Sequence, residues 1–256
     1  MHGLHSFAFG LGNIINHSYS LAFGLGNIIN GSDSFVAGTN LETSANNQIL
    51  FGKNNKKNLE TLFAIGNGEG PEEAERANIF EIDINSNTNI GTNNIINGSH
   101  NFVVGNNLQV TGGYKTVFGK YNLNNGELFM IGAGESDDTR KNLLSLDASG
   151  AFKIGFLNSC IGNNCFVIGS NNTIDPFEGE GYSLYCSNSS ILNGRGNHIK
   201  YNNSSFILGD ENTIETKAST AENSTLVGLI GNNLSCIFET GLNRQGPTLI
   251  IGKYNS

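Results

Sequence analysis

The sequence predicts an all-β chain that folds as a parallel β-solenoid with coils of fourteen residues. Glycine recurs at this spacing behind a short apolar run, as in Phe7-Ala8-Phe9-Gly10 and Leu21-Ala22-Phe23-Gly24. A constant short period indicates one structural unit stacked on copies of itself. Fourteen residues are too few for a helical repeat, and the apolar runs suit strands. The repeat glycines are Gly10, Gly24, Gly38, Gly52, Gly66, Gly91, Gly105, Gly119, Gly155, Gly169, Gly194, Gly209 and Gly252.

Composition supports strands joined by tight turns. The 256 residues include 34 Gly but only 3 Pro. The formal net charge is −8, so the chain has little means of neutralising phosphates and we expect no nucleic-acid partner. The sequence has no run of eighteen apolar residues, so we expect no membrane insertion by this segment. Because Gly252-Lys253-Tyr254-Asn255 copies Gly119-Lys120-Tyr121-Asn122 from mid-chain, we expect a segment of a longer protein.

Each coil is expected to hold two strands, one ending at the glycine, position zero, and one centred near plus five. Glycine and asparagine take the tight turns that β-branched residues avoid. We expect identical polar side chains to stack and to hydrogen-bond along the solenoid. Serine occupies minus four as Ser6, Ser20, Ser34, Ser190, Ser205 and Ser224, and asparagine occupies plus three as Asn13, Asn27, Asn94, Asn172, Asn197 and Asn212.

The apolar triplet before each glycine predicts assembly. Side chains alternate between the faces of a strand, so three apolar residues in a row indicate that both faces are covered. A thin coil buries only one face, and the other must contact another chain, because leaving a large side chain in water costs about 1.5–3 kcal/mol. We place Ala8 and Val103 at this covered seam, where aspartate would abolish assembly. The more polar strand near plus five, as in residues 107–111, should face solvent.

These repeats resemble the Ser-Val-Ala-Ile-Gly repeats of YadA-like heads in trimeric autotransporter adhesins, which bacteriophage tail fibres also reuse. The resemblance is carried by Ser6-Phe7-Ala8-Phe9-Gly10, Ser20-Leu21-Ala22-Phe23-Gly24 and Ser205-Phe206-Ile207-Leu208-Gly209, and it covers most of the chain. It implies a left-handed parallel β-roll, a homotrimer of chains packed side by side, and a role in attachment to surfaces.

Two matching stretches interrupt the repeats with a charged loop and a hairpin. Residues 62–69 lead to a hairpin at 78–83, and residues 128–135 lead to one at 142–147. One continuous solenoid would then comprise 1–90 and 91–154, each of coils plus a loop-hairpin insertion, and 155–256, of coils with lateral insertions. Such insertions look similar to those of phage tail fibres, which favours a virion fibre over a bacterial surface adhesin.

A lateral insertion at 175–186 holds the candidate ligand-binding residues, because insertions in a solenoid project from its side. Aromatic rings can stack on sugars, and carboxylates accept hydrogen bonds from their hydroxyls. The alternative is that these aromatic residues fill a gap or contact a neighbouring chain. The candidates are Phe177, Glu178, Tyr182 and Tyr185.

The sequence predicts no catalytic residue, metal site or cofactor. Asp83-Ile84-Asn85-Ser86-Asn87 begins like a calcium loop, yet Asn94 stands where the bidentate glutamate belongs. Cysteines form no paired zinc pattern, and free thiols are expected, with a Cys160–Cys165 bond as the alternative if their Cα atoms lie within about 7 Å. The four are Cys160, Cys165, Cys186 and Cys236.

The sequence thus favours a non-enzymatic, trimeric attachment segment that contacts a host-surface glycan or protein receptor from a virion, or from a bacterial cell surface. Two other classes are less favoured. A glycan depolymerase needs two carboxylates in a groove, with loop candidates Glu135, Asp137, Asp138, Glu178 and Glu180. An ice-binding solenoid needs an unbroken ladder of identical residues, which Ile14, Glu42 and Gln109 interrupt.

Overall fold

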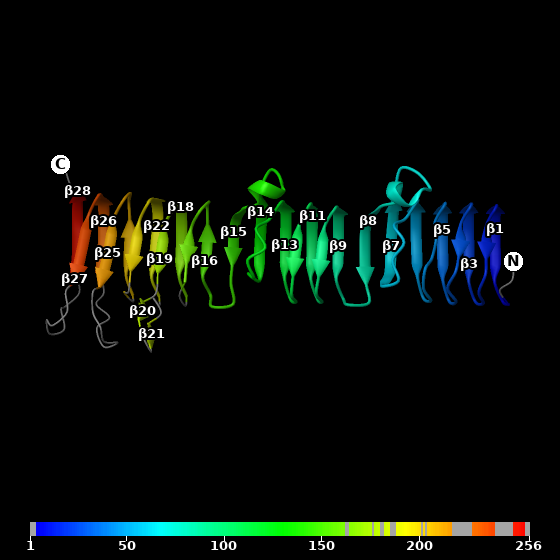
Figure 1. The fold of residues 1–256 in the computed structure, drawn as a ribbon, viewed down its shortest axis with the longest axis horizontal. Coiled ribbons are helices and arrows are strands. Elements are labelled where there is room, and N and C mark those ends of the chain that lie inside the picture. The colour runs from blue at the N-terminus through cyan, green and yellow to red at the C-terminus, as the bar shows by residue number, and fades with distance from the viewer. Residues whose placement is uncertain are drawn as a thin grey trace. The chain divides into compact units, whose positions relative to one another are not determined.

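The computed structural model is an all-β solenoid, which confirms the predicted class (Figure 1). It divides into two compact units: Met1–Asn124 with Gly134–Arg140, and Asn125–Ala133 with Lys141–Ser256. Within the described residues, no helix is long and apolar enough to cross a membrane. The described residues are 4–161, 164–175, 177–179, 182–184, 188–200, 202, 204–216, 227–238 and 248–253.

In the first unit, the strands of the first wall outside residues 61–92 pair in parallel, and each residue lies beside the residue fourteen positions later, such as Phe7 beside Leu21 and Gly10 beside Gly24. The first wall contains β1 (Phe7–Leu11), β3 (Leu21–Leu25), β5 (Phe35–Thr39), β6 (Ile49–Lys53), β7 (Thr61–Asn67), β8 (Asn78–Asp83), β9 (Thr88–Thr92), β11 (Phe102–Asn106) and β13 (Thr116–Lys120). The second wall contains β2 (Ile14–Ile15), β4 (Ile28–Ile29), β10 (Ile95–Asn97) and β12 (Gln109–Thr111).

The second unit repeats this two-walled plan and adds an antiparallel hairpin of β20 (Phe177–Gly179) and β21 (Tyr182–Leu184). Its first wall contains β14 (Phe129–Ala133), β15 (Asn142–Leu146), β16 (Phe152–Ile154), β18 (Phe166–Ser170), β22 (Ser190–Arg195), β24 (Phe206–Leu208), β26 (Val227–Asn232) and β28 (Thr248–Lys253). Its second wall contains β17 (Ser159–Cys160), β19 (Thr173–Asp175), β23 (His198–Lys200), β25 (Thr213–Thr216) and β27 (Ser235–Phe238).

The middle residue of each apolar triplet points into the coil, between the walls. Val36 and Val103 are fully buried, whereas Phe102 beside Val103 is 40% exposed. Our placement of Val103 at an intermolecular seam is therefore wrong, because the interior of its own coil buries it. The outward residues that flank it form the outer face. The inward row of the first unit is Ala22, Val36, Leu50, Ala64, Val103 and Val117; Ile15, Ile29 and Val110 approach it from the second wall, and Leu41 and Leu108 from the turn between the walls.

The repeat glycine is required by the closeness of successive coils. Gly24 has φ +118°, in the range that side chains rarely adopt, and a Cβ there would lie 2.0 Å from the carbonyl oxygen of Gly38. The same overlap recurs at Gly105 with Gly119. Any larger residue would therefore force two neighbouring coils apart, which explains the spacing that the sequence shows.

Left-handed backbone residues recur every seven positions, twice per coil. In the first unit the series runs His5, Gly12, Tyr19, Gly26, Asp33, Asn40, Asn47 and Asn54, and it resumes as Ser86, Asn93, His100, Asn107, Tyr114 and Tyr121. Asparagine and glycine tolerate this conformation better than other residues do. Each coil is thus built from two half-coils with related turns.

The predicted asparagine ladder is confirmed in both units. In the first, Asn27 Nδ2 donates to Asn13 Oδ1 at 3.0 Å and to the Gly38 carbonyl at 3.0 Å. In the second, Asn212 Nδ2 donates to Asn197 Oδ1 at 3.0 Å. These side chains satisfy polar groups of three successive coils, and buried polar groups are costly unless they are satisfied in this way.

Our assignment of Ser190 to the minus-four position is wrong by one residue. Ser190 pairs with Phe166 and Phe206, so its neighbour Ser189 takes the buried corner that Ser34 takes in an earlier coil. A β-bulge sets Asn193 and Gly194 opposite the single residue Gly169. The extra residue is absorbed there without changing which side of the strand faces the core.

Each charged insertion ends in strands that run antiparallel to the stack. In the first antiparallel module, β7, β8 and β9, the strand β8 is antiparallel to both neighbours. In the second antiparallel module, β14, β15 and β16, the strand β15 has this role. The loops carry short 3₁₀ helices, η1 (Glu73–Glu75) and η2 (Asp137–Thr139), which stand out from the coils in Figure 1.

Candidate functional site

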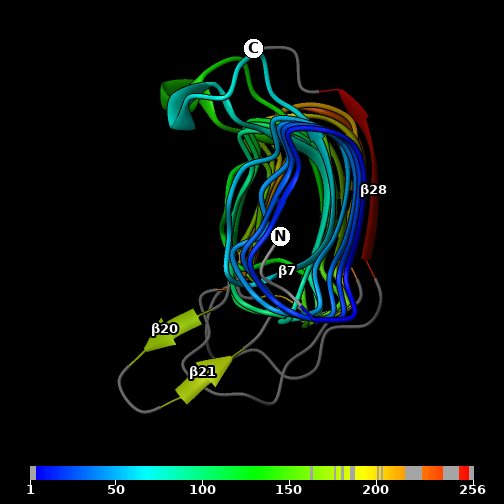
Figure 2. The same cartoon turned by 90° about the vertical axis from the view of Figure 1, so that its right-hand side faces the viewer.

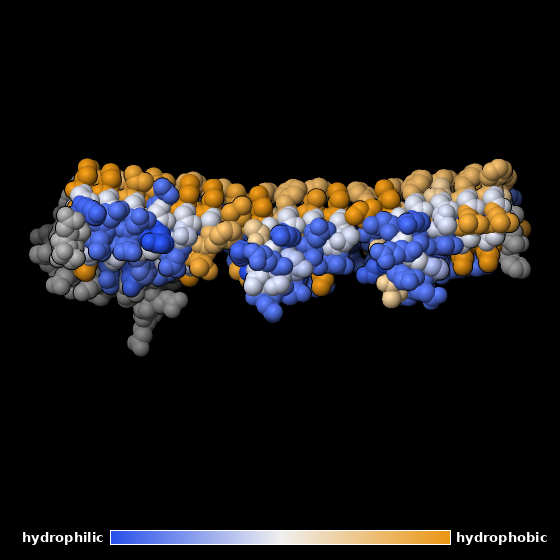
Figure 3. Space-filling view, turned by 90° about the horizontal axis from the view of Figure 1, so that it is seen from above, coloured by the Kyte–Doolittle hydropathy of each residue, from blue (hydrophilic) through white to orange (hydrophobic). Residues whose placement is uncertain are grey.

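The outer face of the first wall carries exposed or half-buried apolar side chains in most coils. In the first unit, phenyl rings follow one another along the stack, with centroid distances of 5.9 Å for Phe23–Phe35, 5.6 Å for Phe35–Phe51 and 5.8 Å for Phe51–Phe63. Figure 3 shows orange apolar atoms along this side of the coils and blue polar atoms over the insertions. The large exposed residues of this face in the first unit include Phe7, Phe9, Leu21, Ile49, Phe51 and Phe102. We call this surface the apolar face.

The second unit continues the pattern with aliphatic residues. Phe152 and Phe166 stack with centroids 5.5 Å apart. Beyond them, Leu192 and Leu208 project outward beside the buried Ile191 and Ile207. Both units therefore present a surface whose composition resembles a protein interior.

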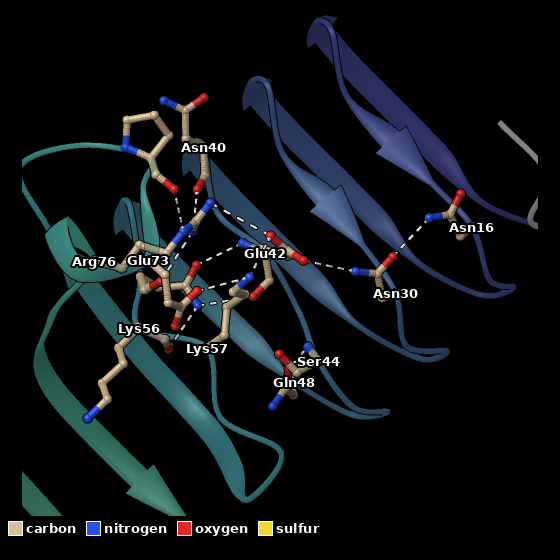
Figure 4. A network of polar contacts seen from close by, with 12 residues as sticks. Asn16, Asn30, Asn40, Glu42, Ser44, Gln48, Lys56, Lys57, Glu73 and Arg76 are labelled. Atoms are coloured by element: carbon tan, nitrogen blue, oxygen red, sulfur yellow. Dashed lines mark hydrogen bonds and ion pairs between the residues drawn. The ribbon is translucent and has the colours of Figure 1, made fainter.

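The second wall differs because polar side chains follow one another along much of its outer side in the first unit. Asn16 Nδ2 donates to Asn30 Oδ1 at 2.9 Å, and Asn30 Nδ2 donates to Glu42 Oε1 at 3.3 Å. Figure 4 shows this row leading to the loop that carries η1. Such a row is well solvated and needs no covering partner.

Arg76 anchors the η1 loop on the coils. Its guanidinium donates to three backbone carbonyls: Asn40 at 3.0 Å, Asn55 at 3.3 Å and Pro71 at 2.9 Å (Figure 4). It also lies 3.7 Å from a carboxylate oxygen of Glu42. The five donors of arginine suit such a multiple contact, so this residue fixes the loop against two coils.

Arg140 anchors the η2 loop on the first unit in the same way. Its Nη1 donates to the carbonyls of Asn107 at 2.8 Å and Asn122 at 3.3 Å. Its Nη2 pairs with Asp137. Asp137 was a candidate catalytic carboxylate, and the structure shows it as an exposed partner of this arginine.

The antiparallel modules carry carboxylates beside their inward positions. In the first module, the Thr61 hydroxyl donates to Glu81, and Asn58 Nδ2 donates to the same oxygen at 3.1 Å. In the second, Ser145 Oγ donates to Glu127 Oε1 at 3.1 Å, and Lys153 forms an ion pair with that carboxylate. The neighbouring coils have apolar residues at the inward positions, so these polar groups are specific to the modules.

A polar pocket of about 600 Å³ opens beside the first antiparallel module. It lies where the second wall has no strand: in the described residues 30–94, this wall is represented only by the isolated bridge of Glu42 to Ile28. Inward residues of β8 and β9 line the pocket, and β10 of the second wall borders it through Ile95 and Ile96. The lining includes Glu60, Glu81 and Asp83. Asp83 Oδ1 accepts hydrogen bonds from the backbone N–H groups of Asn85 and Asn87, as in a tight turn.

Three predicted ligand-binding residues lie on the β20–β21 hairpin. Phe177 pairs with Leu184, and Gly179 pairs with Tyr182, which places Glu178 between them on β20. Figure 2 shows this hairpin outside the stacked coils of its unit. Tyr185 lies outside the described residues. The structure thus sets Phe177, Glu178 and Tyr182 on one lateral hairpin.

Cys160 and Cys165 are buried thiols in the core of the second unit and Cys236 is a half-buried thiol, and none of the three is joined in a disulfide. A hydrogen bond with Cys165, together with burial, raises the pKa of the Cys160 thiol. Burial also raises the pKa of Cys236. Thiols held protonated in this way react slowly. Cys186 lies outside the described residues.

No family model matches this chain, and neither does any curated protein. The function of this chain must therefore be inferred from the geometry of the apolar face, the anchored loops and the pocket.

Sequence reasoning missed Arg76, Arg140 and the pocket. Both arginines end a charged loop and precede an apolar strand, and this shared place in the two insertions was the available signal. The pocket had a weaker signal: Glu81 and Asn89 interrupt the inward apolar pattern within otherwise apolar strands.

Proposed function

We propose that this chain is a non-enzymatic segment of a homotrimeric fibre or head that attaches to a host or cell surface, with left-handed coils as in the YadA-like heads that its repeats resemble. The apolar face is the observation that carries this proposal. Each large side chain left in water forgoes about 1.5–3 kcal/mol. Contiguous apolar surface beyond a few hundred Å² is rare on monomers and marks an interaction site.

Copies of the same chain are the partners that fit this face best. The face repeats every fourteen residues, and parallel copies would match it coil for coil. Most homo-oligomers have closed symmetry, so the same surface is buried on every copy. The number three follows from the family resemblance.

The anchored loops support a role in attachment. They project from the side opposite the apolar face, so assembly would leave them accessible. Three identical chains present every loop three times, and weak contacts then gain avidity. The paired insertions favour a virion fibre, a bacterial cell surface being the alternative, with a glycan or protein as the receptor.

Light scattering on the purified chain tests the assembly. We expect a mass of about 82 kDa, three times the 27.3 kDa of one chain. Replacing two outward residues of one coil, Ile49→Ser with Phe51→Ser, should shift the mass toward a single chain. The control Ile14→Ser removes an exposed apolar residue from the second wall and should leave the trimer intact. A stably folded single chain of unmodified sequence would refute the proposal.

A further inference from the structure

The polar pocket beside the first antiparallel module has the size and chemistry of a ligand site. Ligand sites commonly enclose about 300–1,000 Å³ and hold a few well-placed polar groups, and this pocket measures about 600 Å³. All of its lining residues belong to the first unit. None of its lining residues is an outward residue of the apolar face, so the proposed assembly would not cover them.

Several polar groups of the pocket are held in place before any ligand arrives. Glu81 receives hydrogen bonds from Asn58 and Thr61 at one oxygen and from Asn78 at the other. Asn94 Nδ2 donates to Asn89 Oδ1 at 2.8 Å. These bonds fix the side chains but leave carboxylate lone pairs and amide groups available. A site fixed in this way loses little entropy when it binds.

The charge of the lining selects the class of ligand. The pocket contains four carboxylates, Glu60, Glu73, Glu81 and Asp83, and two cations, Lys56 and Arg76, so its formal charge is −2. Carboxylates accept strong hydrogen bonds from hydroxyl groups and repel anions. Ile95 and Ile96 add apolar surface that suits C–H groups. A neutral molecule rich in hydroxyl groups fits this lining best.

The second antiparallel module carries a longer side chain at the position that matches Asn89. Glu81 pairs with Asn89 across β8 and β9, and Ser145 pairs with Lys153 across β15 and β16. Lys153 thus holds the position of Asn89, and its long side chain forms an ion pair with Glu127. The first module has the shorter asparagine at this position, and its pocket stays open.

We propose that this pocket binds a neutral sugar residue of a surface glycan. The carboxylates accept hydrogen bonds from the sugar hydroxyls, and the asparagine amides donate to them or accept from them. The isoleucines contact the C–H groups of the sugar. The inference takes its biological meaning from the proposed attachment function, for which it names the receptor chemistry. Glycans that carry sialic acid or phosphate are disfavoured by the negative lining.

The test is a glycan array that holds neutral and acidic glycans, probed with the whole chain. We expect neutral glycans to bind. Asn89→Lys, which copies Lys153, should weaken that binding at least tenfold, and Asn125→Lys, the same exchange at an exposed position outside the pocket, serves as the matched control with unchanged binding. A second variant, Asn93→Gly, keeps the left-handed backbone at φ 56° and removes one lining amide, so binding should fall a few-fold.

Circular dichroism and light scattering on each variant separate binding from folding and assembly. Should Asn89→Lys fail to fold, Asn93→Gly decides the matter. Binding unaffected in a folded variant, binding of acidic glycans alone, or no neutral glycan bound would overturn the inference. A single-chain mass with neutral-glycan binding retained would instead overturn only the proposed assembly.

Discussion

The two antiparallel modules form the same hydrogen bond with donor and acceptor exchanged between strands. In the first module the hydroxyl lies on β7, as Thr61, and the carboxylate on β8, as Glu81. In the second, the carboxylate of Glu127 lies two residues before the start of β14 and the hydroxyl of Ser145 lies on β15. The pairing across the hairpin is thus kept although neither residue type is.

Each module places one carboxylate and one hydroxyl near its inward side. The residue on the following strand, Asn89 or Lys153, then sets the charge beside that carboxylate. Lys153 neutralises Glu127 in the second module. In the first, amide groups of Asn58 and Asn78 bind the carboxylate of Glu81 and leave space beside it. The first module thus has amide groups and a pocket beside its carboxylate, whereas the second has an ion pair.

Removing Lys153 should cause the largest loss in the free energy of unfolding. Lys153→Met leaves the Glu127 carboxylate, whose side chain is 4% exposed, without its cation. Losing one partner of a buried pair costs about 3–5 kcal/mol. Urea unfolding followed by circular dichroism would measure the loss. Adding Glu127→Gln should recover most of it, and a loss below about 1 kcal/mol would show that the pair is not needed.

Exchanging the hydroxyl and carboxylate positions of the first module, Thr61 and Glu81, tests whether the two modules are interchangeable. T61E alone sets two carboxylates side by side and should cost about 2 kcal/mol, since like charges in contact repel. T61E with E81S and N89K copies the second module and should return to within about 1 kcal/mol of the parent. Pairs in contact typically couple by about 0.5–3 kcal/mol. Strictly additive losses in urea unfolding would mean that the modules are not interchangeable.

The smallest effect is expected from the ion pair on the η1 loop. A hydrogen bond to Glu73 and the charge of Glu42 raise the pKa of Lys57 above 10.5. Because its folded-state pKa is raised, this contribution is present below pH 10.5 and is lost as the pH rises through the folded-state pKa. Lys57→Met should cost at most about 1 kcal/mol at pH 7, as exposed pairs do. Urea unfolding at pH 7 and pH 11 would check this, and an equal cost at both would contradict the charge-based account.

The sequence predicted the fold well because the fold depends on a repeated local rule. Glycine at position zero and asparagine at plus three are needed in nearly every coil, so their spacing is visible. The sequence could not show that Val103 points inward. All three residues of its triplet are apolar, so the alternation of side chains along the strand does not reveal which side faces the core. Residue size was a usable signal in some coils, because small Ala22 stands between the larger Leu21 and Phe23, and small Ala64 between the larger Phe63 and Ile65.

The site was less predictable because its contacts leave little trace in sequence. Arg76 and Arg140 bind backbone carbonyls, which any residue could supply. The pocket exists because a strand is missing from the second wall, and an absent partner has no pattern. The bulge at Asn193 stayed hidden because it adds a residue inside an irregular coil.

The left-handed residues at every seventh position have a consequence for how such a chain can change in length. A duplication of fourteen codons adds one complete coil and keeps every later phenylalanine on its own side. A duplication of seven codons would also give the backbone a turn of the same kind. It would, however, shift every later residue by half a coil and move the later apolar residues from the first wall to the second. Growth and shrinkage by full turns are therefore the genetic steps that keep the apolar face on one side of the solenoid.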